Sequence, residues 1–175
     1  LNNENLDYFK KLVYERATRK PIAYLLNKKF FWKSEFYVNQ NTLIPRPDTE
    51  IIIEQILKVT KNKHCLRILD IGVGSGCILL SILKEKKNFY GTGIDISKNS
   101  LDISRINAKK LSIEKRVKFF QSDVDKFDQG KYDLIVSNPP YINRNKIKYL
   151  ESDVSKFEPR LALDGGLDGL SVVRK

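Results

Sequence analysis

Short apolar runs alternate with segments of helical periodicity over most of the chain. Four runs are rich in β-branched and aliphatic residues, at 66–71, 89–94, 117–120 and 132–137. They are too short for helices and lack a polar face, which is typical of strands buried in a sheet. Residues 77–84 and 98–110 have the spacing of amphipathic helices, and Ser97 is a candidate cap for the second. Strands that alternate with helices predict an α/β fold with a parallel sheet.

The region before residue 66 has a different pattern. The first 17 residues carry apolar side chains at helical spacing and predict a helix that ends before Pro21. The aromatic stretches 30–32 and 35–38 flank Lys33-Ser34 and predict a β-hairpin that turns at those two residues.

A proline-framed segment follows the hairpin. Ile44-Pro45-Arg46-Pro47 is expected to be stiff and extended, because each proline restricts the residue before it. A single arginine in so rigid a frame favours a role close to a ligand, so Arg46 and Pro47 are candidate substrate-proximal residues. A helix should begin near Asp48, with a core face formed by Ile51, Ile52, Ile56 and Leu57.

The composition excludes several classes of protein. The 175 residues are 41% hydrophobic and 30% charged, which is ordinary for one folded core and unlike a disordered chain. No apolar run reaches the roughly 18–20 residues of a membrane span, and the amino terminus lacks the blocks of a signal peptide. We therefore expect no membrane association and a cytoplasmic location. Cys65 and Cys77 have neither metal-ligand nor disulfide-framework spacing, so no metal site is expected.

The charge is strongly basic, with a net value of +11 and a pI of about 9.6. Lysines are spread along nearly the whole chain, which favours a general compositional bias. Attraction to nucleic acid, or to a partner bound on it, is the alternative, and the charge leaves it open.

The first strand is joined to its helix by Asp70-Ile71-Gly72-Val73-Gly74-Ser75-Gly76. Glycines in such a loop let the backbone approach a ligand closely and point N–H groups at it from the helix amino terminus. The spacing differs from the dinucleotide fingerprint, and there is no Walker lysine. A nucleotide-like cofactor is therefore predicted to lie against Asp70, Gly72, Val73, Gly74, Ser75 and Gly76.

Two acidic residues extend this predicted site. Asp95 ends the second strand, at about the distance from Gly72 expected of an acid that accepts from both ribose hydroxyls. Asp123 follows the third strand beside Val124, and its carboxylate could accept from the exocyclic amine of a base. Two further acids, Asp125 and Asp128, lie nearby and keep that assignment open.

The fourth strand ends in Asn138-Pro139-Pro140-Tyr141. Ligands of open α/β sheets bind at the carboxyl ends of strands, where these residues would lie. An amide or aryl amine nitrogen is a weak nucleophile, because its lone pair is delocalised. The Asn138 side-chain oxygen and the Pro139 carbonyl can accept its two N–H groups while Tyr141 packs against the planar group. Placement of this kind replaces a general base.

Together these residues resemble the class I S-adenosylmethionine-dependent methyltransferases. The resemblance implies S-adenosyl-L-methionine as the cofactor and contact of Asn138 with both cofactor and substrate. It also implies a Rossmann-like, mostly parallel sheet with helices on both faces. The tetrapeptide narrows the resemblance to enzymes that methylate a planar nitrogen, in either a nucleic-acid base or a glutamine side chain.

The flanking segments favour one family. Residues 19–24, the hairpin, 43–50 and 158–169 resemble the peptide chain release factor glutamine methyltransferases. That resemblance implies N5-methylation of the glutamine in the Gly-Gly-Gln motif of release factors, the partners in translation termination. Association with the ribosome and direct nucleic-acid binding stay open. It divides the chain into the remnant of a helical substrate-binding domain at 1–27, a hairpin linker at 28–44 and a methyltransferase domain at 45–175.

Two alternative functions remain. An N6-adenine methyltransferase acting on DNA or RNA shares the tetrapeptide, but the segments 44–47 and 164–169 argue against it. A noncatalytic binding module would not need Asp95 and Asn138 intact. The family's sheet has seven strands, so we also expect a carboxyl-terminally incomplete sheet with an exposed edge after strand four, and little activity from this segment alone.

Overall fold

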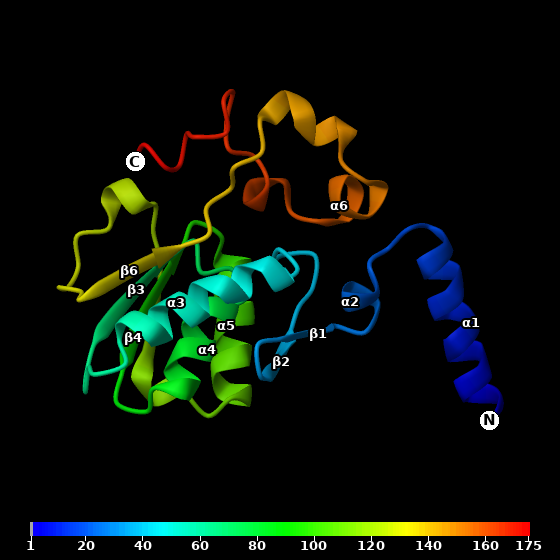
Figure 1. The fold of residues 1–175 in the computed structure, drawn as a ribbon. Coiled ribbons are helices and arrows are strands. Elements are labelled where there is room, and N and C mark those ends of the chain that lie inside the picture. Colours follow the sequence, from blue (N-terminus) through cyan, green and yellow to red (C-terminus); the bar gives the residue numbers. More distant parts are fainter. Residues whose placement is uncertain (1) are drawn as a thin grey trace.

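The computed structural model describes residues 2–175. Its centre is a sheet of four parallel strands in the order β5-β4-β3-β6 (Figure 1). The strands are β3 Arg67–Ile71, β4 Tyr90–Asp95, β5 Val117–Gln121 and β6 Leu134–Ser137. The four strands predicted from the apolar runs, and their parallel pairing, are confirmed.

Three long helices cover one face of this sheet (Figure 1). α4 Cys77–Glu85 connects β3 to β4, α5 Lys98–Lys110 connects β4 to β5, and α3 Glu50–Val59 packs on α4. Right-handed crossovers that advance in one direction keep α4 and α5 on the same face. The return connection from β5 to β6 belongs to the other face and holds only the 3-10 turn η3 Val124–Lys126. Within residues 2–175, the three long helices thus cover one face, and the other face carries η3.

The main core lies between the sheet and these helices. Ile68, Val117 and Val136 point from the strands into a cluster of buried α4 side chains. A β-carbon added at Gly91 would lie 2.8 Å from Leu79 Cδ1. The glycine in β4 thus lets α4 settle directly on the sheet.

The helix boundaries follow the prediction more closely than the helix faces do. α5 has the predicted bounds, and Ser97 Oγ accepts from the Ser100 N–H at 3.2 Å. In α3, Ile53 and Ile56 are buried, whereas Ile51 is 59% exposed. The predicted core face was wrong at Ile51. With three consecutive isoleucines, the sequence does not show which of them faces the core. The preceding 3-10 turn, η1 Pro47–Thr49, determines how α3 is rotated about its axis.

The predicted hairpin is present, with its turn displaced by one residue. Its strands are β1 Lys28–Phe31 and β2 Ser34–Tyr37. The turn is Trp32-Lys33 instead of Lys33-Ser34, and Trp32 has a φ of 51°. Trp32 N donates to Glu50 Oε1 at 2.8 Å, and its Nε1 donates to Glu85 Oε1 at 2.9 Å. These partners are distant in sequence, so local turn preferences could not reveal them.

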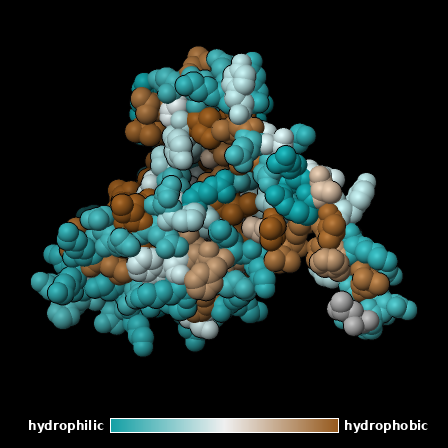
Figure 2. Space-filling model, turned by 45° about the vertical axis from the view of Figure 1, so that its right-hand side comes forward, coloured by the Kyte–Doolittle hydropathy of each residue, from teal (hydrophilic) through white to brown (hydrophobic). Residues whose placement is uncertain are grey.

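The amino-terminal helix α1 Asn3–Ala17 projects from the body as an arm (Figures 1 and 2). It buries none of its side chains, and Figure 2 shows apolar side chains along it. Arg16 ties its last turn to the far end of the chain by donating to Asp153 Oδ2 at 2.9 Å. The short helix α2 Ile22–Leu25 follows. No helix within residues 2–175 is both long and apolar enough to cross a membrane.

Residues 141–175, which we term the lobe, lie at the top of Figure 1. Their helical elements are η4 Arg144–Tyr149, α6 Ser152–Phe157 and η5 Arg160–Ala162. Outside the lobe, a further 3-10 turn, η2 Glu114–Arg116, precedes β5. The last residues form turns rather than the start of the expected helix. A second apolar cluster of Tyr24, Val38 and Ile44, with Phe157 packed against it, joins the lobe to the amino-terminal part.

Candidate active site

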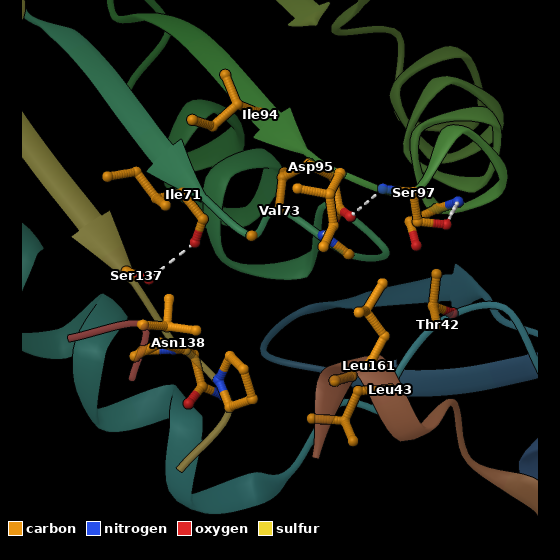
Figure 3. Close-up of a pocket in the computed structure, with 18 of the residues that line it drawn as sticks. Thr42, Leu43, Ile71, Val73, Ile94, Asp95, Ser97, Ser137, Asn138 and Leu161 are labelled. Atoms are coloured by element: carbon orange, nitrogen blue, oxygen red, sulfur yellow. Dashed lines mark hydrogen bonds between the residues drawn. The ribbon is translucent and has the colours of Figure 1, made fainter. Parts of the chain in front are cut away.

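A pocket of about 250 Å³ opens at the carboxyl ends of β3, β4 and β6. From β3 the chain first adds β4 and β5 on one side, and it later adds β6 on the other side of β3. The strand order therefore reverses at β3, and the pocket lies at this switch point of the sheet. Most lining residues fall within six segments, at 41–49, 71–78, 94–100, 122–124, 137–140 and 159–164. Figure 3 shows these walls facing one another, with Asp95 and Val73 on one side and Leu43 and Leu161 on the other.

The glycine loop is shaped by left-handed backbone rather than by crowding. Gly72 and Gly74 have φ values of 72° and 56°, and a β-carbon added at Gly72 would meet no atom within 4 Å. The N–H groups of Gly72 and Val73 both donate to Ile94 O at 2.9 Å, which fixes the loop against β4. Gly72, Val73, Gly74 and Ser75 line the pocket. Gly76 instead lies under α4, where a β-carbon would be 2.8 Å from Leu80 Cδ1.

Asp95 faces the pocket from the end of β4 and is held in a single orientation. Its Oδ2 accepts from the Gly74 N–H at 3.0 Å and its Oδ1 from the Ser97 N–H at 2.9 Å (Figure 3). Burial raises the pKa of this carboxyl, while the backbone N–H groups of Ser97, Gly74 and Ile96 act in the opposite direction. Each oxygen retains acceptor capacity, so the carboxylate fits two hydroxyl groups of a bound ribose.

Asp70 occupies a different environment from the rest of the predicted cofactor site. It is buried on the helical face of β3 and is absent from the pocket lining. Burial, together with the nearby negative charge of Asp95, raises its pKa to about 8, although a hydrogen bond from the Leu79 backbone N–H acts in the opposite direction. Its Oδ2 has no hydrogen-bond partner within residues 2–175. The structure thus places Asp70 behind the loop that lines the pocket.

Asp123 and Val124 line the pocket on the side of β5. Asp123 Oδ2 accepts from Lys175 Nζ at 2.7 Å, and this hydrogen bond lowers the pKa of Asp123. Lys175 also lines the pocket. The carboxylate predicted to meet a base therefore carries a lysine partner in this structure.

Asn138, Pro139 and Pro140 line the pocket at the end of β6. Asn138 Nδ2 donates to Thr49 Oγ1 at 3.5 Å, and no described residue donates to its Oδ1. In this orientation the oxygen is available to a substrate N–H. Tyr141 is 68% exposed and outside the pocket lining, so it stands at the surface beside the site.

The glycine-rich turn at 164–169 supports the segment after Pro140. Ile142 N donates to Leu163 O at 3.0 Å, and Gly165 N donates back to Ile142 O at 2.9 Å. A β-carbon at Gly165 would lie 2.8 Å from Pro140 O. Only a residue without a side chain lets these two backbones lie so close. The sequence marked this turn as a family feature but gave no indication of its position against the tetrapeptide.

Arg46 lines the pocket, whereas Pro47 begins η1 outside the lining. Arg46 Nη2 lies 2.5 Å from Glu158 Oε1, and only 2% of the Glu158 side chain is exposed. Sequence reasoning missed Thr49, which contacts Asn138, Lys175, which pairs with Asp123, and Glu158, which pairs with Arg46 behind the pocket lining. A buried carboxylate 112 positions from its arginine leaves no local pattern, although both residues lie in segments that were singled out.

Within residues 2–175, no group of three or more His, Cys, Asp or Glu side chains is arranged to hold a metal ion.

The comparisons with known proteins agree with this arrangement. The family model of the methyltransferase small domain matches residues 48–166, which is more than half of the chain. The chain belongs to the methyltransferase small domain family. The match spans the glycine loop, Asp95 and Asn138.

Curated relatives show which methyltransferases the chain is similar to. The chain is 41% identical over 176 residues to the release factor glutamine methyltransferase of Caulobacter vibrioides, and the match covers 100% of this chain and 61% of the relative. It is 43% identical over 172 residues to the protein of the same name from Buchnera aphidicola subsp. Acyrthosiphon pisum, covering 98% and 61%. The chain thus spans about 61% of the length of these curated relatives.

A solved structure supports the fold of the domain. The hMettl16 catalytic domain, in complex with MAT2A 3'UTR hairpin 6, matches with a TM-score of 0.65 and 16% sequence identity. The match covers 79% of this chain and 53% of the other. At this identity the likeness concerns the class I methyltransferase fold alone.

Proposed function

We propose that the protein transfers a methyl group from S-adenosyl-L-methionine to the side-chain amide nitrogen of a glutamine in peptide chain release factors. One observation carries the proposal. Asn138, with a free side-chain oxygen, lines the same pocket as the glycine loop and Asp95. The names of the relatives from Caulobacter vibrioides and Buchnera aphidicola support the choice of substrate.

The cofactor side of the pocket fits S-adenosyl-L-methionine. Gly72 and Gly74 leave open space where side chains would stand, and Asp95 offers two oriented carboxylate oxygens for the ribose. Asp123 and Val124 would meet the base once Lys175 releases Asp123. When bound, the cofactor supplies an electrophilic methyl group. The protein residues bind it and orient it toward Asn138.

On the acceptor side, placement carries the chemistry. The Asn138 side-chain oxygen and the Pro139 carbonyl would accept the two N–H groups of the substrate amide. These acceptors turn the nitrogen toward the methyl group and stabilise the positive charge that develops on the nitrogen. The proton leaves after transfer, so no residue needs to act as a base beforehand.

The proposal extends to the partner and to the organisation of the chain. Release factors would be the protein substrate. The net charge of +11 would favour docking near the ribosome and contact with nucleic acid. We propose that 1–27 belongs to a helical substrate-binding domain, that 28–44 is a hairpin linker and that 45–175 forms the methyltransferase domain. The location expected for such an enzyme is the cytoplasm.

The test is methyl transfer with radiolabelled S-adenosyl-L-methionine and three acceptors. These are a release factor, the same factor with the glutamine of its Gly-Gly-Gln motif replaced by alanine, and a mixture of DNA and RNA. We expect label in the first acceptor alone. Label in nucleic acid alone would establish the adenine alternative and overturn the proposal. Equal labelling of both release factors would show that the acceptor is a different residue.

A further inference from the structure

We propose that Glu158 is a positioning residue that holds the two acceptor-side walls of the pocket at a fixed separation. One wall is the segment 42–49, which we call the linker from here on and which is distinct from the hairpin linker 28–44. The other wall is the segment 159–165, which supports the tetrapeptide. The inference rests on the proposed function, because it explains how the amide clamp of that reaction, formed by Asn138 and Pro139, keeps its geometry.

The Glu158 carboxylate joins two parts of the chain that are far apart in sequence. Its Oε2 accepts from the Ile44 N–H at 3.2 Å, and its Oε1 lies 2.5 Å from Arg46 Nη2. The Glu158 side chain is only 2% exposed, whereas that of Arg46 is 37% exposed and reaches the pocket. Both oxygens are thus committed to the linker, and solvent does not compete for them.

From Glu158 the chain leads directly to the tetrapeptide. Pro159 and Leu161 line the pocket, and Leu163 O then accepts from Ile142 N. Residues Ile142 and Asp164 form a parallel bridge, next to the close approach of Gly165 to Pro140. A shift at Glu158 therefore reaches Pro139 and Pro140 through backbone hydrogen bonds over a few residues.

The linker wall is anchored on its other side. Ile44 packs with Tyr24 and Val38 in the second apolar cluster, and Tyr24 Oη donates to Thr42 O at 2.7 Å. The linker continues to Thr49, whose hydroxyl contacts Asn138 Nδ2. Glu158 thus links the residue that orients Asn138 with the segment that supports Pro140.

The chemical nature of this link favours specificity over stability. An ion pair with one buried partner, such as Glu158, gives little net stabilisation, because the cost of desolvating that partner offsets much of the attraction. A buried pair does, however, impose a defined geometry. Methyl transfer needs that geometry, since a displacement of about 1 Å can cost on the order of 10²-fold in rate.

The experiment compares Glu158→Gln with Asp153→Asn in the full protein. Glu158→Gln keeps an oxygen for the Ile44 N–H but loses the charge that pairs with Arg46. Asp153→Asn removes a different ion pair that joins the lobe to the amino-terminal part, the one with Arg16, and leaves the Glu158 contacts intact. Methyl transfer, cofactor affinity and hydrogen exchange are measured well below the melting temperature of each variant.

We expect Glu158→Gln to lower kcat for a release factor by about 10- to 100-fold. The dissociation constant of the cofactor should change less than about twofold in this variant. Asp153→Asn should keep the parent rate. Amide hydrogen exchange should accelerate at 141–144 and 163–166 and stay unchanged at 72–76. The double variant Arg46→Gln/Glu158→Gln removes the unpaired charge and separates positioning from folding. We expect its melting temperature to recover while its kcat stays low.

Three results would overturn the inference: exchange at the parent rate at 141–144 in Glu158→Gln, the same acceleration in Asp153→Asn, or a kcat that recovers together with the melting temperature in the double variant. The exchange measurement needs no substrate. If the parent protein fails to methylate a release factor, the proposed function fails, and exchange still decides the role of Glu158.

Discussion

The two sides of the pocket are built in different ways. The cofactor side comes from one continuous unit, in which the glycine loop follows β3 and Asp95 ends β4, and Gly74 N donates directly to the Asp95 carboxylate. The acceptor side is assembled from the linker at 42–49, the tetrapeptide at 138–141 and the lobe segment at 159–165. Neighbours in sequence shape the first side, whereas contacts across about a hundred residues shape the second.

This difference separates binding from catalysis within one pocket. A local unit can hold its ligand even when distant segments move. The proposed amide clamp would depend on the contacts that join the linker, the lobe and β6. Changes on the acceptor side should therefore lower kcat and spare cofactor affinity, and changes on the cofactor side should do the reverse.

The largest effect is expected from Asn138→Ala on the acceptor side. Removing the oxygen that accepts the substrate amide should lower kcat by about 10²–10³-fold, the range seen when one preorganised hydrogen-bonding group is lost from an active site. The dissociation constant of S-adenosyl-L-methionine, measured by calorimetry, should stay within about twofold, because other residues hold the cofactor. Asn145→Ala, an exposed amide, is the matched control. Unchanged turnover of Asn138→Ala would contradict the clamp.

The next effect is expected from Asp95→Ala on the cofactor side. Losing charge-assisted hydrogen bonds to the ribose, worth about 1.5–3 kcal/mol, should weaken cofactor binding by about 10- to 150-fold. At saturating cofactor, kcat should fall far less. Asp102→Asn serves as control, because Asp102 pairs only with Arg105 on the exposed face of α5. An unaltered cofactor dissociation constant would remove Asp95 from the site.

A smaller effect on both stability and rate is expected from Gly165→Ala. The added methyl group would meet Pro140 O at 2.8 Å and Gly169 O at 2.7 Å, and both are backbone atoms that cannot rotate away. We expect a loss of about 1–3 kcal/mol in the free energy of unfolding and a lower kcat with unchanged cofactor affinity. In the control Gly130→Ala the new methyl group meets the end of the Tyr132 side chain, beside the amino-terminal ends of the strands and outside the pocket lining. If both variants lose rate equally, the turn does not support the clamp.

The smallest effect concerns Asp70, and it depends on pH. A carboxyl group whose folded pKa is raised to about 8 contributes stability at pH values below its unfolded pKa, and this contribution is lost as the pH rises through the folded pKa. Asp70→Asn should therefore raise the melting temperature more at about pH 9 than at about pH 5. Thermal unfolding of both proteins at the two pH values provides the measurement. An equal shift at both would mean that Asp70 does not titrate in this window.

The sequence predicted the parts of the molecule that depend on neighbouring residues. The alternation of strands and helices, the bounds of α5 and its Ser97 cap all follow from local periodicity and capping, and all are confirmed. The glycine loop and Asp95 belong to the same category, because one strand-loop-helix-strand unit brings them together.

What the sequence could not predict depends on distant partners. The turn at Trp32 is fixed by Glu50 and Glu85, and the burial of Asp70 is decided by the helix that covers β3. The pairing of Arg46 with Glu158 arises only when the linker and the lobe meet. A single sequence contains no signal for such pairs, since their spacing follows from the tertiary fold alone.

Trp32 has a practical consequence for experiments on this protein. It is the single tryptophan of the chain, and its indole N–H bonds to Glu85 at the end of α4. Its fluorescence therefore reports selectively on whether the hairpin is docked against the α/β domain. A shift in emission that precedes the loss of helical circular dichroism would reveal an intermediate with the hairpin detached, read without any added label.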